Sequence, residues 1–228
     1  MIELIQITKT FNAGRPNAFA ALKEISLSIA PQCVTVFKGP SGSGKTTLLS
    51  IVGCMSRPTS GRFMLKGQEM TSLPERFLSE TRRSMFGFVF QSYNLIRGMS
   101  VLENTMIPGY PTGLDHRTLR QRAVTLLERL RIASKAPMRV EHLSGGEQQR
   151  AAIARALINE PSVIIADEPT AHLDTDLAEE LLGFISELKK EGKTIIIASH
   201  DPLVYEADVV DRVVAIRDGR IMKGDLAA

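Results

Sequence analysis

Apolar–polar alternation and short apolar runs along the chain predict a series of β-strands. Residues 2–7 and 25–29 alternate between apolar and polar side chains, which is typical of strands with one buried face. Residues 34–37 form an apolar, β-branched run that is typical of a fully buried strand. Further strands are predicted at residues 63–65, 86–90, 162–166, 194–198 and 209–216.

Apolar residues three and four positions apart predict amphipathic helices between these strands. The clearest cover residues 119–130, 144–158 and 173–188, with shorter helices at 47–52 and 74–83. Strands that alternate with helices favour an α/β fold with a mainly parallel central sheet and helices on its faces. The pattern is helical from about residue 92 to residue 160, so we expect that block to be an inserted helical subdomain.

A glycine-rich segment between the strand at 34–37 and the helix at 47–52 fits the phosphate-binding loop G-x-x-x-x-G-K-[ST]. Its glycines let successive backbone N–H groups turn inward, and the helix N-terminus adds partial positive charge. Lys45 is expected to reach the β- and γ-phosphates, and the Thr46 hydroxyl to ligate Mg²⁺. The alternative is a chance match in a glycine-rich turn. The motif residues are Gly39, Pro40, Ser41, Gly42, Ser43, Gly44, Lys45 and Thr46.

Two adjacent carboxylates, Asp167 and Glu168, end the predicted strand at 162–166. Ligands of parallel sheets bind at the carboxyl ends of the strands, where the glycine loop also lies. Asp167 is therefore a candidate for holding Mg²⁺, directly or through water, and Glu168 for orienting or deprotonating an attacking water. The alternative is that both are surface acids capping a turn before Pro169.

The segment Leu143–Arg150, with the sequence LSGGEQQR, opens the predicted helix 144–158. Ser144 and two glycines at a helix N-terminus make a second candidate anion site, for which one chain has no evident need. The alternative is an ordinary capped helix start. Gln91 and His200 each end a predicted strand and are candidates for contacting the metal, the water or the γ-phosphate, although such residues alone are more often solvent-facing or structural.

Composition narrows the class of protein. The chain has 228 residues, 43% hydrophobic and 23% charged side chains, and a formal net charge of +3, which does not argue for a nucleic-acid partner. Cys33 and Cys54 suggest neither a metal site nor a disulfide framework. No secretory signal and no apolar run of membrane-spanning length is present, so we expect a cytoplasmic protein that another polypeptide would hold at a membrane.

Together these segments resemble the ATP-binding-cassette ATPases over nearly the whole chain. The loop at 39–46 resembles the Walker A motif, 163–168 Walker B, 143–150 the signature motif and 171–174 the D-loop, while Gln91 and His200 resemble the Q-loop and switch residues. The resemblance implies one P-loop ATPase domain over 1–228. Its RecA-like core and antiparallel β subdomain would comprise about 1–91 and 161–228, and its helical subdomain about 92–160.

The resemblance also implies roles for individual residues, with ATP and Mg²⁺ as cofactors. Catalysis is assigned to Glu168, His200 and Gln91, and Mg²⁺ binding to Thr46, Gln91 and Asp167. ATP binding is assigned to Phe11, Gly39, Pro40, Ser41, Gly42, Ser43, Gly44, Lys45, Thr46 and Thr47. The signature residues, acting on the site of a second copy, are Leu143, Ser144, Gly145, Gly146 and Gln148, and the D-loop residue is Asp174.

Within the family, residues 39–49, 82–91 and 101–104 resemble the lipoprotein-release, macrolide-export and cell-division branch. This resemblance implies a homodimer that closes around two Mg-ATP beneath a separate permease, peripheral on the cytoplasmic face of the inner membrane. A mechanotransmitter that moves no substrate is the alternative. Cassettes acting on DNA or ribosomes fit less well, because only about a hundred residues separate Lys45 from Ser144 and one cassette is present. His172, in the D-loop, departs from the family pattern.

Overall fold

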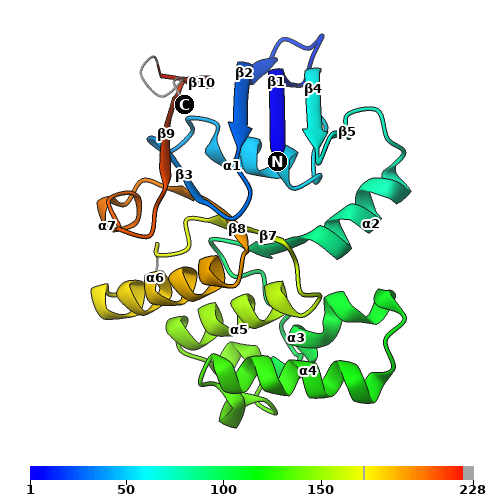
Figure 1. Cartoon of the computed structure of the whole chain (residues 1–228), viewed down its shortest axis with the longest axis vertical. Helices are drawn as coiled ribbons and strands as arrows, with labels where there is room; N and C mark the ends of the chain where they lie inside the picture. The colour runs from blue at the N-terminus through cyan, green and yellow to red at the C-terminus, as the bar shows by residue number, and fades with distance from the viewer. Residues whose placement is uncertain (172, 223–228) are drawn as a thin grey trace.

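The computed structural model describes residues 1–171 and 173–222, which form two β-sheets and the helices that cover them (Figure 1). His172, the atypical D-loop position, lies outside the described residues. The smaller sheet is antiparallel, in the order β2-β1-β4-β5. Its strands are β1 (Ile2–Phe11), β2 (Phe19–Ile29), β4 (Ser60–Leu65) and β5 (Gln68–Glu69).

The larger sheet has the order β10-β9-β3-β8-β7-β6, and all of its pairings are parallel except that of β10 with β9. Its strands are β3 (Val34–Lys38), β6 (Phe86–Val89), β7 (Val163–Asp167), β8 (Thr194–Ser199), β9 (Arg212–Arg217) and β10 (Arg220–Ile221). Strands β3, β7 and β8 are neighbours, so the segments that follow them converge at one edge of the sheet.

Both faces of the central sheet are buried, because alternate residues of its strands belong to different apolar clusters. In β8, Ile196 and Ala198 pack into the cluster shared with the antiparallel sheet and α1 (Lys45–Val52). Ile195 and Ile197 pack into the cluster on the opposite face. A strand with no solvent face has to be apolar throughout, which explains the unbroken apolar run at 195–198.

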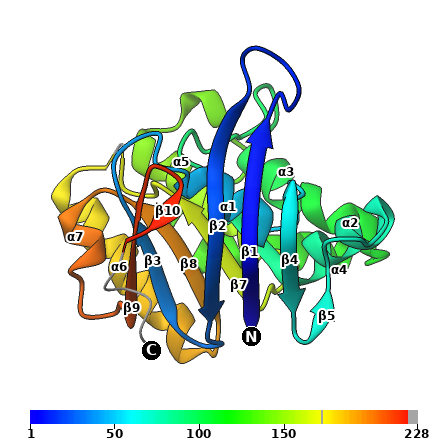
Figure 2. The ribbon, with the colours of Figure 1, turned by 90° about the horizontal axis from the view of Figure 1, so that it is seen from above.

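The second face is covered by α5 (Gly145–Leu157) and α6 (Thr175–Lys190), which lie side by side beneath the sheet (Figure 1). The α5 helix also contacts α3 (Val101–Met106) and α4 (His116–Arg129). The view from above shows the antiparallel sheet in front of this helical layer (Figure 2). The remaining helices are α2 (Glu75–Met85), α7 (Pro202–Tyr205) and the short 3₁₀ segments Ile107–Thr112, Ala133–Lys135 and Val140–His142.

The predicted α/β fold with its antiparallel sheet and helical block is confirmed, and several boundaries differ. The strands β1 and β2 are longer than predicted, because they continue as a hairpin in which Phe11 pairs with Phe19. Strand β6 ends at Val89, so Gln91 lies in the following turn and does not end a strand as predicted. The short β5, α7 and β10 were not predicted from the periodicity.

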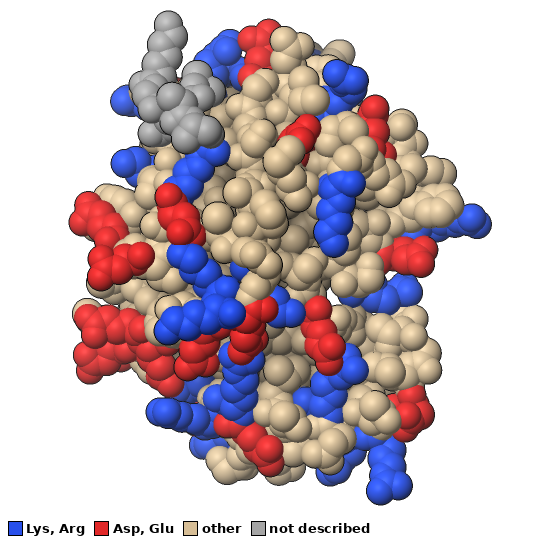
Figure 3. All heavy atoms as spheres, in the orientation of Figure 1, with Lys and Arg blue, Asp and Glu red and all other residues tan. Residues whose placement is uncertain are grey.

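Among the described residues, no helix combines the length and the apolar character needed to cross a membrane. On the face drawn in Figure 3, basic and acidic side chains intermingle. Several of them form ion pairs between elements, such as Arg129 with Glu187 and Arg150 with Glu180. These two pairs join the helical block to α6, and both lie at the rim of a pocket described below.

Candidate functional site: the edge of the central sheet

The glycine loop between β3 and α1 has a backbone that only glycine can adopt at two positions. A Cβ added at Gly39 would lie 2.1 Å from the carbonyl oxygen of Ile216. Gly44 has φ of 108°, and a Cβ there would lie 2.7 Å from the carbonyl oxygen of Ala21. The loop is therefore pressed against β9 and β2, and α1 begins directly after it at Lys45.

The ammonium group of Lys45 folds back onto the loop that precedes it. Its Nζ donates to the carbonyl oxygens of Gly39, at 2.7 Å, and of Pro40, at 3.2 Å. It also lies 3.3 Å from Glu168 Oε1, and only 6% of the Lys45 side chain is exposed. A buried ammonium requires such partners, because desolvation of an unpaired charge is costly.

The Glu168 carboxylate joins the loop to the end of β8. Its Oε2 lies 2.9 Å from Nδ1 of His200 and accepts a weaker hydrogen bond from the His200 backbone N–H at 3.3 Å. The Glu168 backbone has φ of 47°, a left-handed conformation, and its N–H donates to Ala198 at 2.8 Å. The β7–β8 pairing thus fixes this turn and points the carboxylate between Lys45 and His200.

Asp167, the last residue of β7, is partly buried. Burial raises the pKa of its carboxyl group, opposed first by a hydrogen bond from the Thr46 side chain, while the charge of Glu168 raises the pKa further and that of Lys45 lowers it. Its Oδ1 has no hydrogen-bond partner among the described residues. A buried carboxylate oxygen without a partner, beside a hydroxyl group, is a donor set suited to a hard cation.

A cavity of about 270 Å³ lies above this group of side chains. Most of the predicted nucleotide-binding residues line it. Gly39, Pro40 and Asp167 do not line it, and the carbonyl oxygens of Gly39 and Pro40 accept from Lys45 Nζ. Two further lining residues, Phe19 and Ala21, escaped prediction because the hairpin register that places Phe19 opposite Phe11 is a long-range feature. The lining residues are Phe11, Phe19, Ala21, Ser41, Gly42, Ser43, Gly44, Lys45, Thr46, Thr47, Gln91, Glu168 and His200.

The segment at 143–150 does not line this cavity. Ser144 forms a capping box with Glu147 at the start of α5, and Gln148 Nε2 donates to the carbonyl oxygen of Leu143. A Cβ at Gly146 would lie 2.9 Å from Leu177 of α6, so this glycine permits close helix packing. Asp174 caps α6 by accepting from the Leu177 N–H.

The comparisons with known proteins identify the family and the fold. The family described as ABC transporter matches residues 22–171. The chain belongs to the ABC transporter family. It is an ATPase cassette of that family.

Two curated relatives differ in length. MacB of Hahella chejuensis, a macrolide export ATP-binding/permease protein, is 41% identical to this chain over 222 residues. The alignment covers 97% of this chain and 34% of that protein. The chain thus spans about a third of such relatives. The ABC transporter ATP-binding protein YvrO of Bacillus subtilis is 40% identical over 230 residues, covering 100% of the chain and 99% of YvrO.

Among solved structures, the dimeric structure of the bacterial ABC transporter cassette MJ0796 superimposes with a TM-score of 0.90 at 36% identity, covering 100% of both chains. The dimeric post-hydrolysis state of MJ0796 bound to ADP and Pi matches with a TM-score of 0.90 at 35% identity.

Replacing Asp167 by Asn tests the electrostatics of this edge. Because burial raises the folded-state pKa of Asp167, its ionised form destabilises the fold above that pKa. We expect Asp167→Asn, without nucleotide or Mg²⁺, to melt at a higher temperature than the wild type at pH 8. The difference should shrink as the pH falls through the raised pKa, where the wild-type carboxyl becomes neutral. Differential scanning calorimetry at pH 5 to 8 measures this, and a wild type more stable than Asp167→Asn at pH 8 would contradict the assignment.

Proposed function

We propose that this cassette hydrolyses ATP in a homodimer and thereby drives a separate membrane permease, peripheral on the cytoplasmic face of the membrane. The observation that carries the proposal is the Glu168 carboxylate, held between Lys45 and His200 beside the glycine loop. An ammonium group, a carboxylate and an imidazole at a glycine-rich helix N-terminus suit phosphoryl transfer to water. The export-type relatives support a permease partner, and the dimeric MJ0796 structures support the homodimer.

The role of Lys45 follows from its present contacts. Its ammonium is held by two neutral loop carbonyls and by one carboxylate, that of Glu168, whereas bound ATP offers the multiply charged β- and γ-phosphates. When the β- and γ-phosphates enter the loop, the Lys45 ammonium exchanges its present partners for the phosphate oxygens. Glu168 then keeps His200 as its partner and has Oε1 free to accept a proton from the attacking water. His200 orients that carboxylate and contacts the γ-phosphate.

Mg²⁺ fits the residues beside the loop. The buried Oδ1 of Asp167 lacks a partner among the described residues, and an adjacent cation would favour the charged form that burial disfavours. Thr46 and Gln91 would supply the other protein oxygens, and the phosphates would supply further ligands, as is usual for this cation. Bound there, Mg²⁺ would neutralise charge on the β- and γ-phosphate oxygens.

The signature segment completes the site of a second copy. The capping box uses the N–H groups of Ser144 and Glu147, whereas no hydrogen bond among the described residues uses those of Gly145 or Gly146. These two donors at the positive end of α5 suit a γ-phosphate. Leu143 and Gln148 hold the turn that presents them, and Asp174, in the D-loop, caps the start of α6. We assign about 92–160 to the helical subdomain that carries this segment, and the described residues of about 1–91 and 161–228 to the core and β subdomain.

Lys45→Ala should abolish ATP hydrolysis and also destabilise the cassette. The side chain of Glu168 is only 11% exposed, so loss of Lys45 leaves a mostly buried carboxylate with one partner, at a cost of about 1–3 kcal/mol. Adding Glu168→Gln should recover part of that stability without restoring activity. Urea denaturation with a phosphate-release assay measures both effects, with the exposed Lys66→Ala as a control. A Lys45→Ala variant that hydrolyses ATP at the wild-type rate would refute the site.

Phe11→Ala should weaken ATP binding while leaving turnover at saturating ATP nearly unchanged. The ring is 44% exposed and lines the cavity, and stacking on a base is worth about 1–3 kcal/mol. Fluorescence titration with a labelled ATP analogue measures the affinity. Phe77→Ala, which removes another exposed ring outside the cavity, is the matched control. If the Phe11→Ala and Phe77→Ala variants bind the ATP analogue with equal affinity, Phe11 does not stack on adenine.

Glu168→Gln should bind ATP, fail to hydrolyse it and accumulate as a dimer. The amide keeps the shape of the carboxylate but cannot take a proton, so the γ-phosphate that joins the two copies persists. Adding Ser144→Arg should return the protein to monomers, because it obstructs the partner's phosphate. Size-exclusion chromatography with light scattering in Mg-ATP measures the mass. A dimer that survives Ser144→Arg would show that the signature segment is not the second half of the site.

A further inference from the structure

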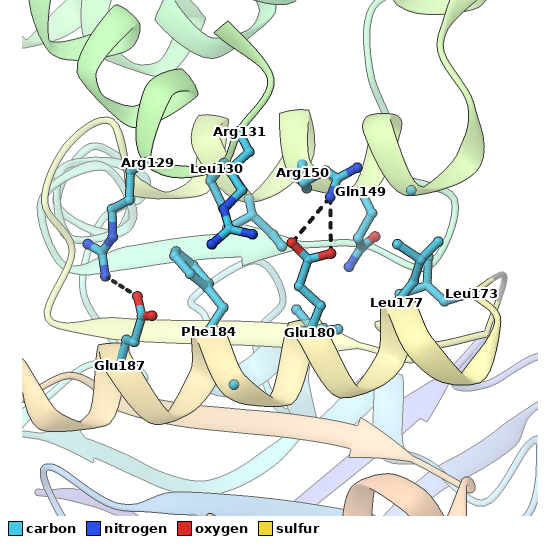
Figure 4. Close-up of a pocket in the computed structure, with 14 residues that line it drawn as sticks. Arg129, Leu130, Arg131, Gln149, Arg150, Leu173, Leu177, Glu180, Phe184 and Glu187 are labelled. Carbon is cyan, nitrogen blue, oxygen red and sulfur yellow. Dashed lines mark hydrogen bonds and ion pairs between the residues drawn. The ribbon is translucent and has the colours of Figure 1, made fainter.

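A second pocket, of about 320 Å³, lies between α5 and α6 and is separate from the nucleotide cavity. Figure 4 shows its floor on α6 and its roof on α5 and the segment after α4. Its walls combine apolar side chains, including Leu173, Leu177 and Phe184, with charged groups at the rim. None of its lining residues belongs to the group around Lys45 and Glu168.

The amide of Gln149 is the unusual feature of this pocket. Gln149 is 3% exposed, and neither its Nε2 nor its Oε1 has a hydrogen-bond partner among the described residues. In Figure 4 its side chain descends from α5 towards α6, between Glu180 and Leu177. Burying an amide without partners costs free energy, so an unmet donor and an unmet acceptor side by side indicate a missing group that offers both.

The rim adds a cationic group. Arg150 pairs with Glu180, and Arg129 pairs with Glu187, so the charges of these two arginines are matched within the pocket. Arg131 also lines the pocket, and its side chain makes no hydrogen bond or ion pair among the described residues. Arg131 is exposed, so the rim offers a solvated positive charge next to an apolar wall.

Gly183 keeps one wall of the pocket open. It lies in the interior of α6, where glycine is less favourable than alanine, and a Cβ added there would meet nothing within 4 Å. Gly183 is exposed, so this part of α6 is open to solvent, and the Arg129 guanidinium lies over the Phe184 ring, 4.9 Å from its centroid.

We propose that this pocket binds a small planar aromatic lactam that carries a carboxylate. The lactam edge pairs with both amide atoms of Gln149, the ring packs against the leucines and Phe184, and the carboxylate pairs with Arg131. A pocket of about this volume, apolar with a few convergent polar groups, suits a bicyclic ligand. The pocket lies outside the cavity around Lys45, although it shares Gly146 with the signature segment, and its ligand would bridge α5 and α6.

The probe is 2-oxo-1,2-dihydroquinoline-4-carboxylate, titrated into the full chain by isothermal titration calorimetry. Its matched controls are naphthalene-1-carboxylate, which lacks the lactam edge, and 2-quinolone, which lacks the carboxylate. We expect the lactam acid to bind with a dissociation constant of about 1 mM or tighter, and each control to bind at least about fivefold more weakly.

Three variants assign each preference to its residue. Gln149→Met should remove the preference for the lactam acid over the naphthoate, and Arg131→Gln the preference over 2-quinolone. Arg120→Gln, an exposed arginine on α4 outside the pocket, should keep both preferences. Gly183→Leu should prevent binding of all three probes while raising the melting temperature, because it fills the pocket and removes a helix-interior glycine.

Two outcomes would overturn the proposal. Absence of binding of the lactam acid at about 1 mM would mean that water alone satisfies Gln149. Binding whose preferences persist in both Gln149→Met and Arg131→Gln would place the probe elsewhere. Because Gly183→Leu is expected to be more stable than the wild type, a loss of binding in that variant could not arise from unfolding.

Discussion

The buried ammonium of Lys45 is the constraint on which the arrangement of the nucleotide edge depends. A charge with 6% exposure needs counter-groups, and the chain supplies them from the glycine loop after β3 and from Glu168 after β7. His200, after β8, holds the other oxygen of the same carboxylate. These contacts are possible only because β3, β8 and β7 are adjacent in a sheet whose two faces are both buried. Its carboxyl edge is then the place where polar side chains can converge.

The unpaired N–H groups at helix N-termini account for the division of the proposed site between two copies. Both α1 and α5 begin with glycine-containing turns, yet only the start of α1 lines the nucleotide cavity. The α5 terminus is satisfied in part by its capping box, and the N–H groups of Gly145 and Gly146 are left for an acceptor from outside. A γ-phosphate bound to Lys45 of one copy would meet that need, and hydrolysis would remove the group that joins the copies.

Local patterns in the sequence predicted most of the strands and helices and the glycine loop, because residue spacing and composition determine these features. The P-loop, the two carboxylates after β7 and the capped start of α5 are all encoded within a few residues. The partner of Glu168 could not be predicted in this way, since Lys45, Glu168 and His200 meet through strand order. The position of Phe19 in the cavity depends on the register of a hairpin. The lack of a partner for the Gln149 amide depends on how α5 packs against α6. Features that arise from register and helix packing have no local signal.

Cross-linking between isotopically distinct copies tests the composite site most directly. In the Glu168→Gln background, with Cys33 and Cys54 replaced by Ser, ¹⁵N-labelled chains carrying Ser41→Cys are mixed with unlabelled chains carrying Gly145→Cys. Both engineered positions are exposed, one in the glycine loop and one at the start of α5. The account predicts a disulfide between labelled and unlabelled peptides that forms in Mg-ATP and not in Mg-ADP, identified by mass spectrometry. If Mg-ATP produces no mixed disulfide, or if its yield is the same in Mg-ADP, the two halves of the site do not meet across an ATP-closed dimer.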